Sequence, residues 1–175
     1  MNNIDLNKIL SKLRSESNAD WIGLREMKET TTYRVIRDLK PASNNISIDH
    51  GIMIEVLVDG QFGYYGTHDI SYEAIKNATE KAYQQAHNAS KYSIHKFTSD
   101  VRPKSVGSYK SNYSIKEVPL DDLMDTLLKS NKTLKQSEKV VSAISMARVV
   151  DMDMRFVSTN GSDLFPLIVY KQLSN

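Results

Sequence analysis

The chain has its clearest hydrophobic pattern in the stretch from residue 51 to residue 89. Over residues 52–58 every second residue is isoleucine or valine, which is the period-two pattern of a strand that is at least half buried. Asp59-Gly60 follows, and the extended pattern resumes over residues 61–65. Because Asp-Gly tolerates the positive φ of a tight turn, these segments predict a two-residue β-hairpin.

A helix is predicted directly after this hairpin. Apolar or small residues recur on one face at helical spacing, namely Ile75, Ala78, Thr79, Ala82 and Ala86. Asp69 or Ser71 can accept hydrogen bonds from the free N–H groups of the first turn. The hairpin therefore leads into a helix that can cover it.

Two further amphipathic helices are predicted nearer the ends of the chain. The first has an apolar stripe of Leu6, Ile9, Leu10 and Leu13, with Asn3 or Asp5 available as its cap. The other opens at Pro119 and runs to about Leu134. Its early turns are acidic and its later turns are basic, which is the order that the helix dipole favours.

The remaining segments predict strands and connections. Residues 19–38 are rich in β-branched and aromatic residues and predict two strands joined near residues 29–32. Residues 40–45 contain proline and asparagine and predict a loop, while residues 90–116 predict a long surface connection. Three more extended segments are expected at residues 140–149, 152–158 and 167–173, with Asn160-Gly161 as a turn.

This order of elements predicts an α+β fold. A mainly antiparallel sheet with hairpins would be covered by about three amphipathic helices. The length of 175 residues suits a single domain over residues 1–175, with a subdivision at the 90–116 connection as the alternative.

The central stretch also resembles a known family. The run G-I-M-I-E-V-L-V-D-G-Q-F-G-Y-Y-G-T-H-D-I-S is similar to the N-terminal domain of the TldD/PmbA family, which has roughly G-V-x-V-x-V-x-x-x-G-x-x-G-x-x-x-T-x-D-L-S there. The matching positions are Gly51, Gly60, Gly63, Thr67, Asp69 and Ser71. Outside this stretch, Ala19-Asp20 and Arg25 resemble the start of the family's domain. Gly161 fits a turn near its end, although Ser158 and Thr159 replace the family's Asn and Ser.

The resemblance implies a bacterial or archaeal zinc metalloprotease, also called a peptide maturation protein or modulator of DNA gyrase. The family's zinc site is a His-Glu-x-x-x-His helix further along its chain, and these residues contain no such motif. Zinc is therefore expected only in the C-terminal half that the family has, with no cofactor in this chain. The resemblance also implies a homo- or hetero-oligomer, such as a dimer, that acts on unfolded peptides.

Composition narrows the classes of protein. There is no cysteine, so disulfides and thiolate metal sites are excluded. No signal peptide and no run of 18 apolar residues is present, which predicts a cytoplasmic protein without a membrane partner. The net charge of +2 is too balanced to favour nucleic acid as a partner.

No catalytic, cofactor-binding or metal-binding residue is assigned from the sequence. The four histidines, His50, His68, His87 and His95, lack the one-turn spacing of a zinc helix. Asp151 and Asp153 could pair as carboxylates, but a solvent-facing position is the simpler interpretation. Basic residues alternate with aromatic ones between residues 91 and 113, which is a weak pattern for nucleic-acid binding: Lys91, Tyr92, Lys96, Phe97, Arg102, Lys104, Tyr109, Lys110 and Tyr113.

Two functional hypotheses follow. The first is a non-catalytic scaffold or substrate-chamber domain of a TldD/PmbA-like zinc metalloprotease that cleaves unfolded peptides, so that this chain alone is no enzyme. The alternative is a stand-alone protein-interaction module that keeps the scaffold without the protease half.

Overall fold

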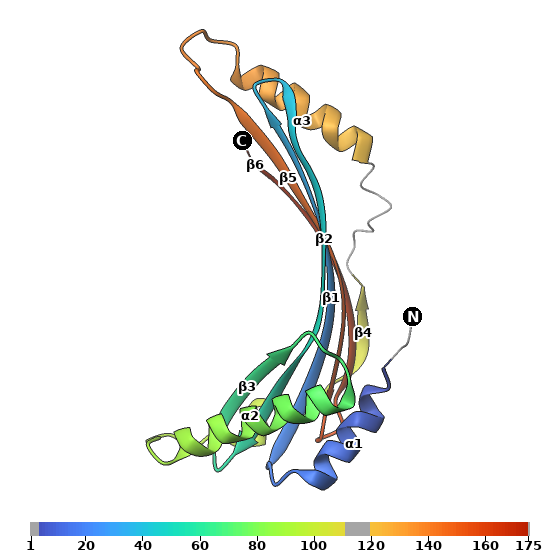
Figure 1. Ribbon diagram of the computed structural model, residues 1–175, viewed down its shortest axis with the longest axis vertical. Helices are drawn as coiled ribbons and strands as arrows, with labels where there is room; N and C mark the ends of the chain where they lie inside the picture. Colours follow the sequence, from blue (N-terminus) through green and yellow to red (C-terminus); the bar gives the residue numbers. More distant parts are fainter. Residues whose placement is uncertain (1–3, 111–119, 175) are drawn as a thin grey trace. The chain divides into compact units, whose positions relative to one another are not determined.

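The computed structural model describes residues 4–110 and 120–174, and within them it shows one six-stranded sheet and three α-helices (Figure 1). The strand order is β3-β2-β1-β5-β6-β4. In chain order the elements are α1 (Leu6–Glu16), β1 (Trp21–Arg37), β2 (Lys40–Val58), β3 (Gln61–Thr67), α2 (Tyr72–Ser90), the 3-10 turn η1 (Ser99–Val101), β4 (Val106–Lys110), α3 (Leu120–Leu134), β5 (Ile144–Ser158) and β6 (Asp163–Ser174). The sheet is mostly antiparallel, which confirms the predicted α+β fold.

The chain forms two compact units that share four strands. Unit 1 contains Met1–Lys28, His50–Tyr109 and Met154–Pro166, and unit 2 contains Glu29–Asp49, Lys110–Asp153 and Leu167–Asn175. One crossing between them, after Tyr109, lies inside the 90–116 stretch that the sequence singles out as an alternative boundary. The assignment of residues 1–175 to a single domain stays a prediction.

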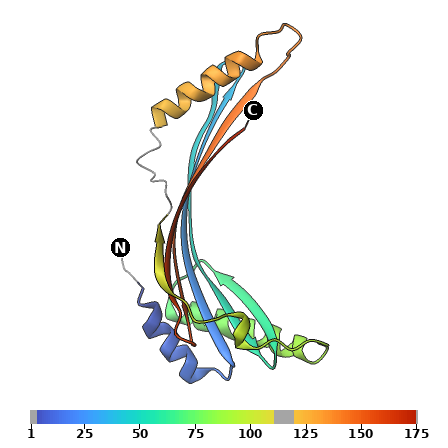
Figure 2. The ribbon, with the colours of Figure 1, turned by 180° about the vertical axis from the view of Figure 1, so that it is seen from behind.

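In unit 1, α1 and α2 cover one face of the sheet (Figures 1 and 2). Both helices begin where the sequence predicts, because the side chain of Asp5 accepts from Lys8 N and that of Ser71 accepts from Ala74 N. The core between helices and sheet contains the predicted apolar residues of β2, including Ile54 and Val56, which are fully buried. The hairpin is also confirmed: β2 and β3 pair antiparallel from Ile52↔Thr67 to Val58↔Gln61.

The helix α2 lies against β3 with no side chain between them at Gly63. A Cβ atom added at Gly63 would collide with the backbone carbonyl oxygen of Ala82 in α2. Ala82 and Ala86 on the facing side of α2 are fully buried and add only methyl groups. Small residues on both elements therefore let the two backbones approach closely.

In unit 2, α3 packs Leu123 and Leu127 against Ile36 of β1 and Ala147 of β5. A fully buried amide, Asn131, ties this helix to the sheet. Its Oδ1 accepts from Leu39 N at 2.9 Å, and its Nδ2 donates to Ile36 O at 3.4 Å. The helix thus matches its prediction in the described part, whereas the expected opening residue Pro119 lies outside the described residues.

The turn between β1 and β2 is fixed by one carboxylate. Asp38 and Leu39 both have positive φ, 50° and 66°, which suits a tight two-residue hairpin turn. The Asp38 carboxylate accepts from Lys135 Nζ at 2.7 Å and from Ala143 N at 3.0 Å. These bonds, led by the one from Lys135, hold the pKa of Asp38 below its ordinary value.

Several predicted breaks between elements are wrong. A single strand, β1 (Trp21–Arg37), takes up nearly all of residues 19–38. The predicted loop at residues 40–45 is the start of β2, because the turn lies at Asp38-Leu39 instead. Residues 144–158 form one strand where two segments were expected, and β4 occupies part of the predicted 90–116 connection. In each case neighbouring strands supply backbone partners, so pairing continues through residues that carry no strong strand signal. The segment predicted at residues 167–173 lies within β6.

We expect Gly63→Ala to destabilise the protein. The new methyl group can be accommodated only if α2 moves away from β3, and overpacking of this kind typically costs about 1–3 kcal/mol. Urea unfolding followed by circular dichroism would measure the loss as a lower midpoint. The matched control is Gly66→Ala, whose Cβ would make only ordinary van der Waals contacts, the nearest with Met53 Cε at 3.7 Å. Equal midpoints for the two variants would contradict the close-packing argument.

We also expect the contribution of Asp38 to stability to depend on pH. Because its pKa is lowered on folding, its contribution is present above the ordinary value of 3.8 and disappears as pH falls below that value. Asn tolerates the positive φ of this position, so Asp38→Asn removes the charge without straining the turn. The variant should have a lower urea midpoint than the original protein at about pH 7, and the difference should shrink towards roughly pH 2. Asp153→Asn, at an exposed position, is the control and should change little at either pH.

Candidate functional site

The polar residues of the central motif organise the junction between β3 and α2. Thr67 Oγ1 accepts from Asp69 N at 3.1 Å, and Asp69 Oδ1 accepts from Ser71 N at 2.9 Å. The bond from Ser71 holds the pKa of Asp69 below its ordinary value. Ser71 in turn caps α2, so all three side chains serve the local backbone. These motif residues therefore have a structural explanation, because they shape the junction and cap α2.

The histidines lie in different local environments. His50 Nε2 lies 3.0 Å from Glu26 Oε1, and His87 Nδ1 lies 3.2 Å from Asp59 Oδ2. The ring of His95 meets that of Phe97 edge-on, while His68 is exposed. Across residues 4–110 and 120–174, no three His, Cys, Asp or Glu side chains come together in a group that could hold a metal ion.

Asp151 and Asp153, the carboxylates that the sequence offered as a pair, lie on β5 in unit 2. Asp153 is exposed and Asp151 is half-buried. The solvent-facing interpretation therefore fits Asp153 better than Asp151.

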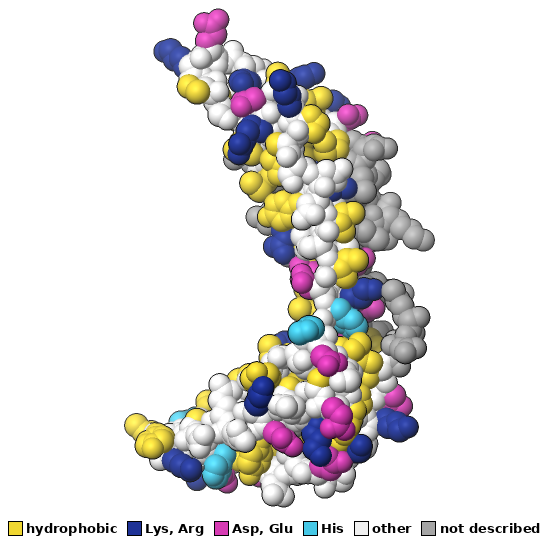
Figure 3. All heavy atoms as spheres, viewed as in Figure 1, with side chains coloured by type: hydrophobic (Ala, Val, Ile, Leu, Met, Phe, Trp, Pro, Cys, Tyr) yellow, Lys and Arg dark blue, Asp and Glu magenta, His cyan; other side chains and the backbone are white. Residues whose placement is uncertain are grey.

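The basic and aromatic residues after α2 differ in their surroundings. Arg102 turns to the sheet and pairs with Glu55, and Phe97 packs on Phe62, whereas Tyr92 is 88% exposed. Tyr113 lies outside the described residues. On the face of unit 1 drawn in Figure 3, basic and acidic side chains are intermixed.

Residues 91–105, called the strap below, are held to the sheet by hydrogen bonds at Phe97 and at Arg102. Phe97 N donates to Gly60 O at 2.8 Å, next to the β2–β3 turn. Arg102 donates from Nη2 and Nε to Glu55 Oε1 at 2.6 and 3.0 Å, and Asn160 Nδ2 donates to Arg102 O at 2.6 Å. The hydrogen bond to Glu55 raises the pKa of Arg102. The strap is thus a fixed part of unit 1, which its sequence did not predict.

Under the strap lies a layer of aromatic rings. Phe62 and Tyr64 alternate with Gly63, which faces α2, so they point to the opposite side of β3. Phe62 contacts Trp21 at a centroid distance of 6.1 Å and Phe97 at 5.8 Å. Burial, together with the charge of Glu55, raises the pKa of Tyr64. Between these rings and the strap is a hollow of about 390 Å³, lined by Gln61, Phe62, Tyr64, Phe97, Val101 and Arg102.

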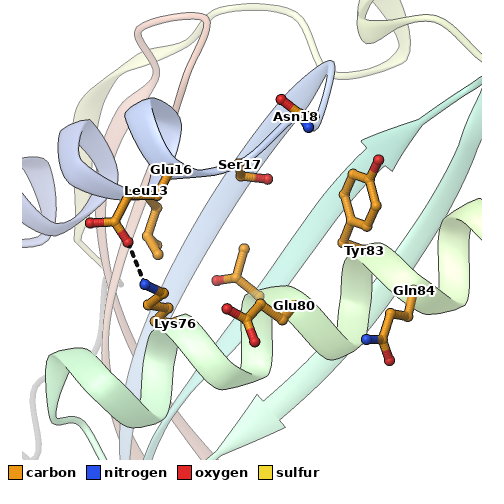
Figure 4. Close-up of a pocket in the computed structure, with 9 residues that line it drawn as sticks. Leu13, Glu16, Ser17, Asn18, Lys76, Glu80, Tyr83 and Gln84 are labelled. Atoms are coloured by element: carbon orange, nitrogen blue, oxygen red, sulfur yellow. Dashed lines mark ion pairs between the residues drawn. The ribbon is translucent and has the colours of Figure 1, made fainter.

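A second hollow, of about 320 Å³, lies between the end of α1 and α2 (Figure 4). Most of its lining residues have polar side chains, and Lys76 Nζ lies 2.8 Å from Glu16 Oε2 at one side of it. This ion pair lowers the pKa of Glu16 and raises that of Lys76. Glu16 and Lys76 therefore neutralise each other's charge, and this ion pair joins α1 to α2.

The outer edges of β3 and β2 differ in how they are protected. At the β3 edge, Tyr64 N donates to the side-chain Oε1 of Gln85 at 2.8 Å. A side chain of α2 therefore already binds one backbone N–H group of this edge. β2 pairs with β3 only from Ile52 onward, and no other strand in the described part of the chain lies beside residues 40–51 on that side. Every residue from 40 to 50 is exposed, including Ile46 at 55% and Ile48 at 63%.

This free stretch of β2, residues 40–49 in unit 2, is called the open edge below. It has no charged residue between Lys40 and Asp49. Edge strands usually carry charges, bulges or a cover that prevent pairing with another chain, and the middle of the open edge has none of these among the described residues. It can therefore accept a further strand through its main-chain N–H and C=O groups. The sequence did not indicate this, because residues 40–45 resemble a loop.

No helix in the described part of the chain is both long and apolar enough to cross a membrane. Comparison with curated protein sequences gives no match. Comparison with protein families matches residues 24–86 to PmbA/TldA metallopeptidase domain 1. The match covers most of β1, all of β2 and β3, and most of α2.

Solved structures share the fold over nearly the whole chain. TldE from Thermococcus kodakarensis is similar with a TM-score of 0.67 and 16% identity, over 96% of this chain and 38% of its own. Two proteins described as modulators of DNA gyrase are also similar. The one from Thermotoga maritima has a TM-score of 0.64 and 14% identity, over 96% of this chain and 38% of its own. The one from Bacteroides thetaiotaomicron has a TM-score of 0.66 and 13% identity, over 99% of this chain and 40% of its own.

This chain therefore spans about two fifths of the length of these proteins. At such identities the likeness shows the fold, and the family match adds the relationship in sequence over the hairpin and α2. Together the family match over residues 24–86 and the shared fold support an N-terminal TldD/PmbA-family domain.

Proposed function

We propose that this chain is the non-catalytic scaffold and substrate-chamber domain of a TldD/PmbA-type zinc metallopeptidase that cleaves unfolded peptides. The family that it matches is described as a metallopeptidase, and the domain matched is the first one. The open edge of β2 carries the proposal, because it is a surface suited to an extended polypeptide.

The chemistry of the open edge suits an unfolded substrate. A strand added to a sheet edge is held mainly by main-chain hydrogen bonds, each contributing on the order of 0.5–1.5 kcal/mol net. Such bonds require an extended backbone and no particular side chain. The uncharged stretch from Pro41 to Ile48 neither repels nor selects charged residues. An unfolded polypeptide can offer an extended backbone at any point along its length, so the edge discriminates by conformation rather than by sequence.

The described residues do not fit a zinc ion. They bring no three metal-binding side chains together, so the proposal places the zinc site in another part of the peptidase and derives no chemical step here. We further propose that the domain works in the cytoplasm and pairs with another family member, as a homo- or hetero-oligomer. The exposed, unprotected edge supports a partner of some kind, since long free edges favour association.

The alternative function is a stand-alone interaction module. The same open edge supports it, because strand addition needs no peptidase. The two functions differ in whether peptide binding at the edge is followed by cleavage.

We expect Ile46→Lys and Ile48→Lys, singly and together, to weaken binding of an unfolded polypeptide. A lysine on an edge strand opposes pairing with a further strand. Binding of a reduced, carboxymethylated polypeptide would be measured by fluorescence anisotropy, and slower amide exchange over residues 40–49 would locate it. The double substitution should weaken binding about tenfold, the equivalent of about 1.4 kcal/mol.

The control is Val141→Lys, which adds the same charge at a position that is 91% exposed and outside any strand. It should leave binding unchanged. If it weakens binding as much as the edge substitutions do, the effect is one of charge and the open edge is not the binding surface.

A comparison of zinc content and peptidase activity separates the two functions. The 175-residue chain and the complete reading frame that encodes it would be purified in parallel and incubated with the same unfolded polypeptide. We expect zinc and cleavage only in a longer protein, and loss of both on treatment with a chelator. If the reading frame ends with this chain and the chain neither holds zinc nor cleaves, the interaction module is the correct function.

A further inference from the structure

The hollow beneath the strap has the lining of a binding pocket for one side chain. Its volume of about 390 Å³ falls in the usual range of ligand pockets, roughly 300–1,000 Å³. Three of its six lining residues are aromatic, Phe62, Tyr64 and Phe97, and a fourth is Val101. Phe97, Tyr64 and Val101 remain 40–46% exposed, so this apolar surface is accessible from outside.

The fastening of the strap shapes this hollow. Phe97 is anchored through its backbone to Gly60, and Arg102 is anchored on both sides, to Glu55 through its side chain and to Asn160 through its carbonyl. Two of the three lining residues from the strap, Phe97 and Arg102, are therefore placed by bonds that do not involve the hollow itself. A preformed pocket of this kind loses little conformational entropy when it is filled.

The charges around the hollow favour a neutral occupant. Its one cationic group, Arg102, is already paired with Glu55 at 2.6 Å, so the pair has no net charge to offer a carboxylate or a phosphate. Neither Lys96 nor Lys104 of the strap is among the lining residues, and Lys104 Nζ lies beside Gly161. The polar hollow between α1 and α2 lacks such a lining, since it has one aromatic residue, Tyr83, among mostly polar side chains.

The arrangement of the rings favours an aromatic occupant over an aliphatic one. Phe62 meets Trp21 edge-to-face at an interplanar angle of 84°, lies tilted by 52° to Phe97, and has the Arg102 guanidinium 5.1 Å from its centroid. A ring inserted beside them gains edge-to-face contacts that a leucine of similar size cannot make.

We propose that this hollow binds a single uncharged aromatic side chain, phenylalanine or tyrosine, from an extended polypeptide. This goes beyond the proposed function, because it requires neither zinc nor the open edge. It would give unit 1 a preference for particular residues, whereas the edge of β2 accepts a backbone regardless of sequence.

The only tryptophan of the chain provides the readout. Trp21 is 2% exposed and contacts Phe62, which lines the hollow. The fluorescence of Trp21 should therefore change when a ring enters the hollow, although Trp21 itself touches neither solvent nor the added peptide.

The test is a titration of the intact chain with three blocked pentapeptides, acetyl-Ser-Gly-X-Gly-Ser-amide, in which X is phenylalanine, leucine or glutamate. We expect saturable binding of the phenylalanine peptide, about tenfold tighter than that of the leucine peptide, and no binding of the glutamate peptide. Phe97→Leu, which removes a ring and keeps an apolar side chain, should reduce the preference for phenylalanine to about twofold or less. Tyr92→Leu removes a ring that is 88% exposed on the same strap and should change nothing.

A second variant tests whether a loss of peptide binding could come from misfolding. Val101→Phe places a ring at the hollow from a half-exposed position and should block the peptide while the unfolding midpoint is kept. Equal binding of the phenylalanine and leucine peptides, tighter binding of the glutamate peptide, or no saturable binding would each overturn the proposal. Ile46→Lys should leave this titration unchanged, so its outcome is separate from that of the peptide-binding edge.

Discussion

The contact between α2 and β3 at Gly63 determines the arrangement of unit 1. Because no side chain separates the two backbones there, α2 lies against one face of the hairpin, and only alanine-sized residues fit beneath it. The alternation of β3 then sends Phe62 and Tyr64 to the opposite face. The strap covers that face, and the Glu55–Arg102 pair holds it there. The aliphatic core therefore lies on the face of the hairpin next to α2, and the aromatic layer lies on the opposite face.

Unit 2 depends on polar rather than apolar contacts at its turn. The Asp38 carboxylate and the buried Asn131 amide bind backbone groups of the β1–β2 turn and of the segment before β5. They fix the hairpin while leaving the outer side of β2 uncovered. A hairpin held from one side only can keep a free edge without losing its own structure, and that edge is the feature of the domain best suited to another chain.

These two surfaces would recognise different properties of a polypeptide. The open edge of β2 presents backbone groups and can select an extended conformation. The hollow beneath the strap presents rings and can select a side chain. TldE and the two proteins described as modulators of DNA gyrase share the fold on which both surfaces lie.

The sequence by itself determined the local structure of this domain. Asp59-Gly60 predicted the hairpin turn, Ser71 the start of α2, and the spacing of Ile75 to Ala86 its buried face, because each depends on residues close in the chain. The glycine and Thr-x-Asp pattern was sufficient to indicate the family. Only the tertiary structure decided that residues 40–45 are a strand, since their pairing is supplied by β1 rather than by their own propensity. It alone brought Arg102 to Glu55, 47 residues away, because a long-range ion pair leaves no periodic signal in sequence.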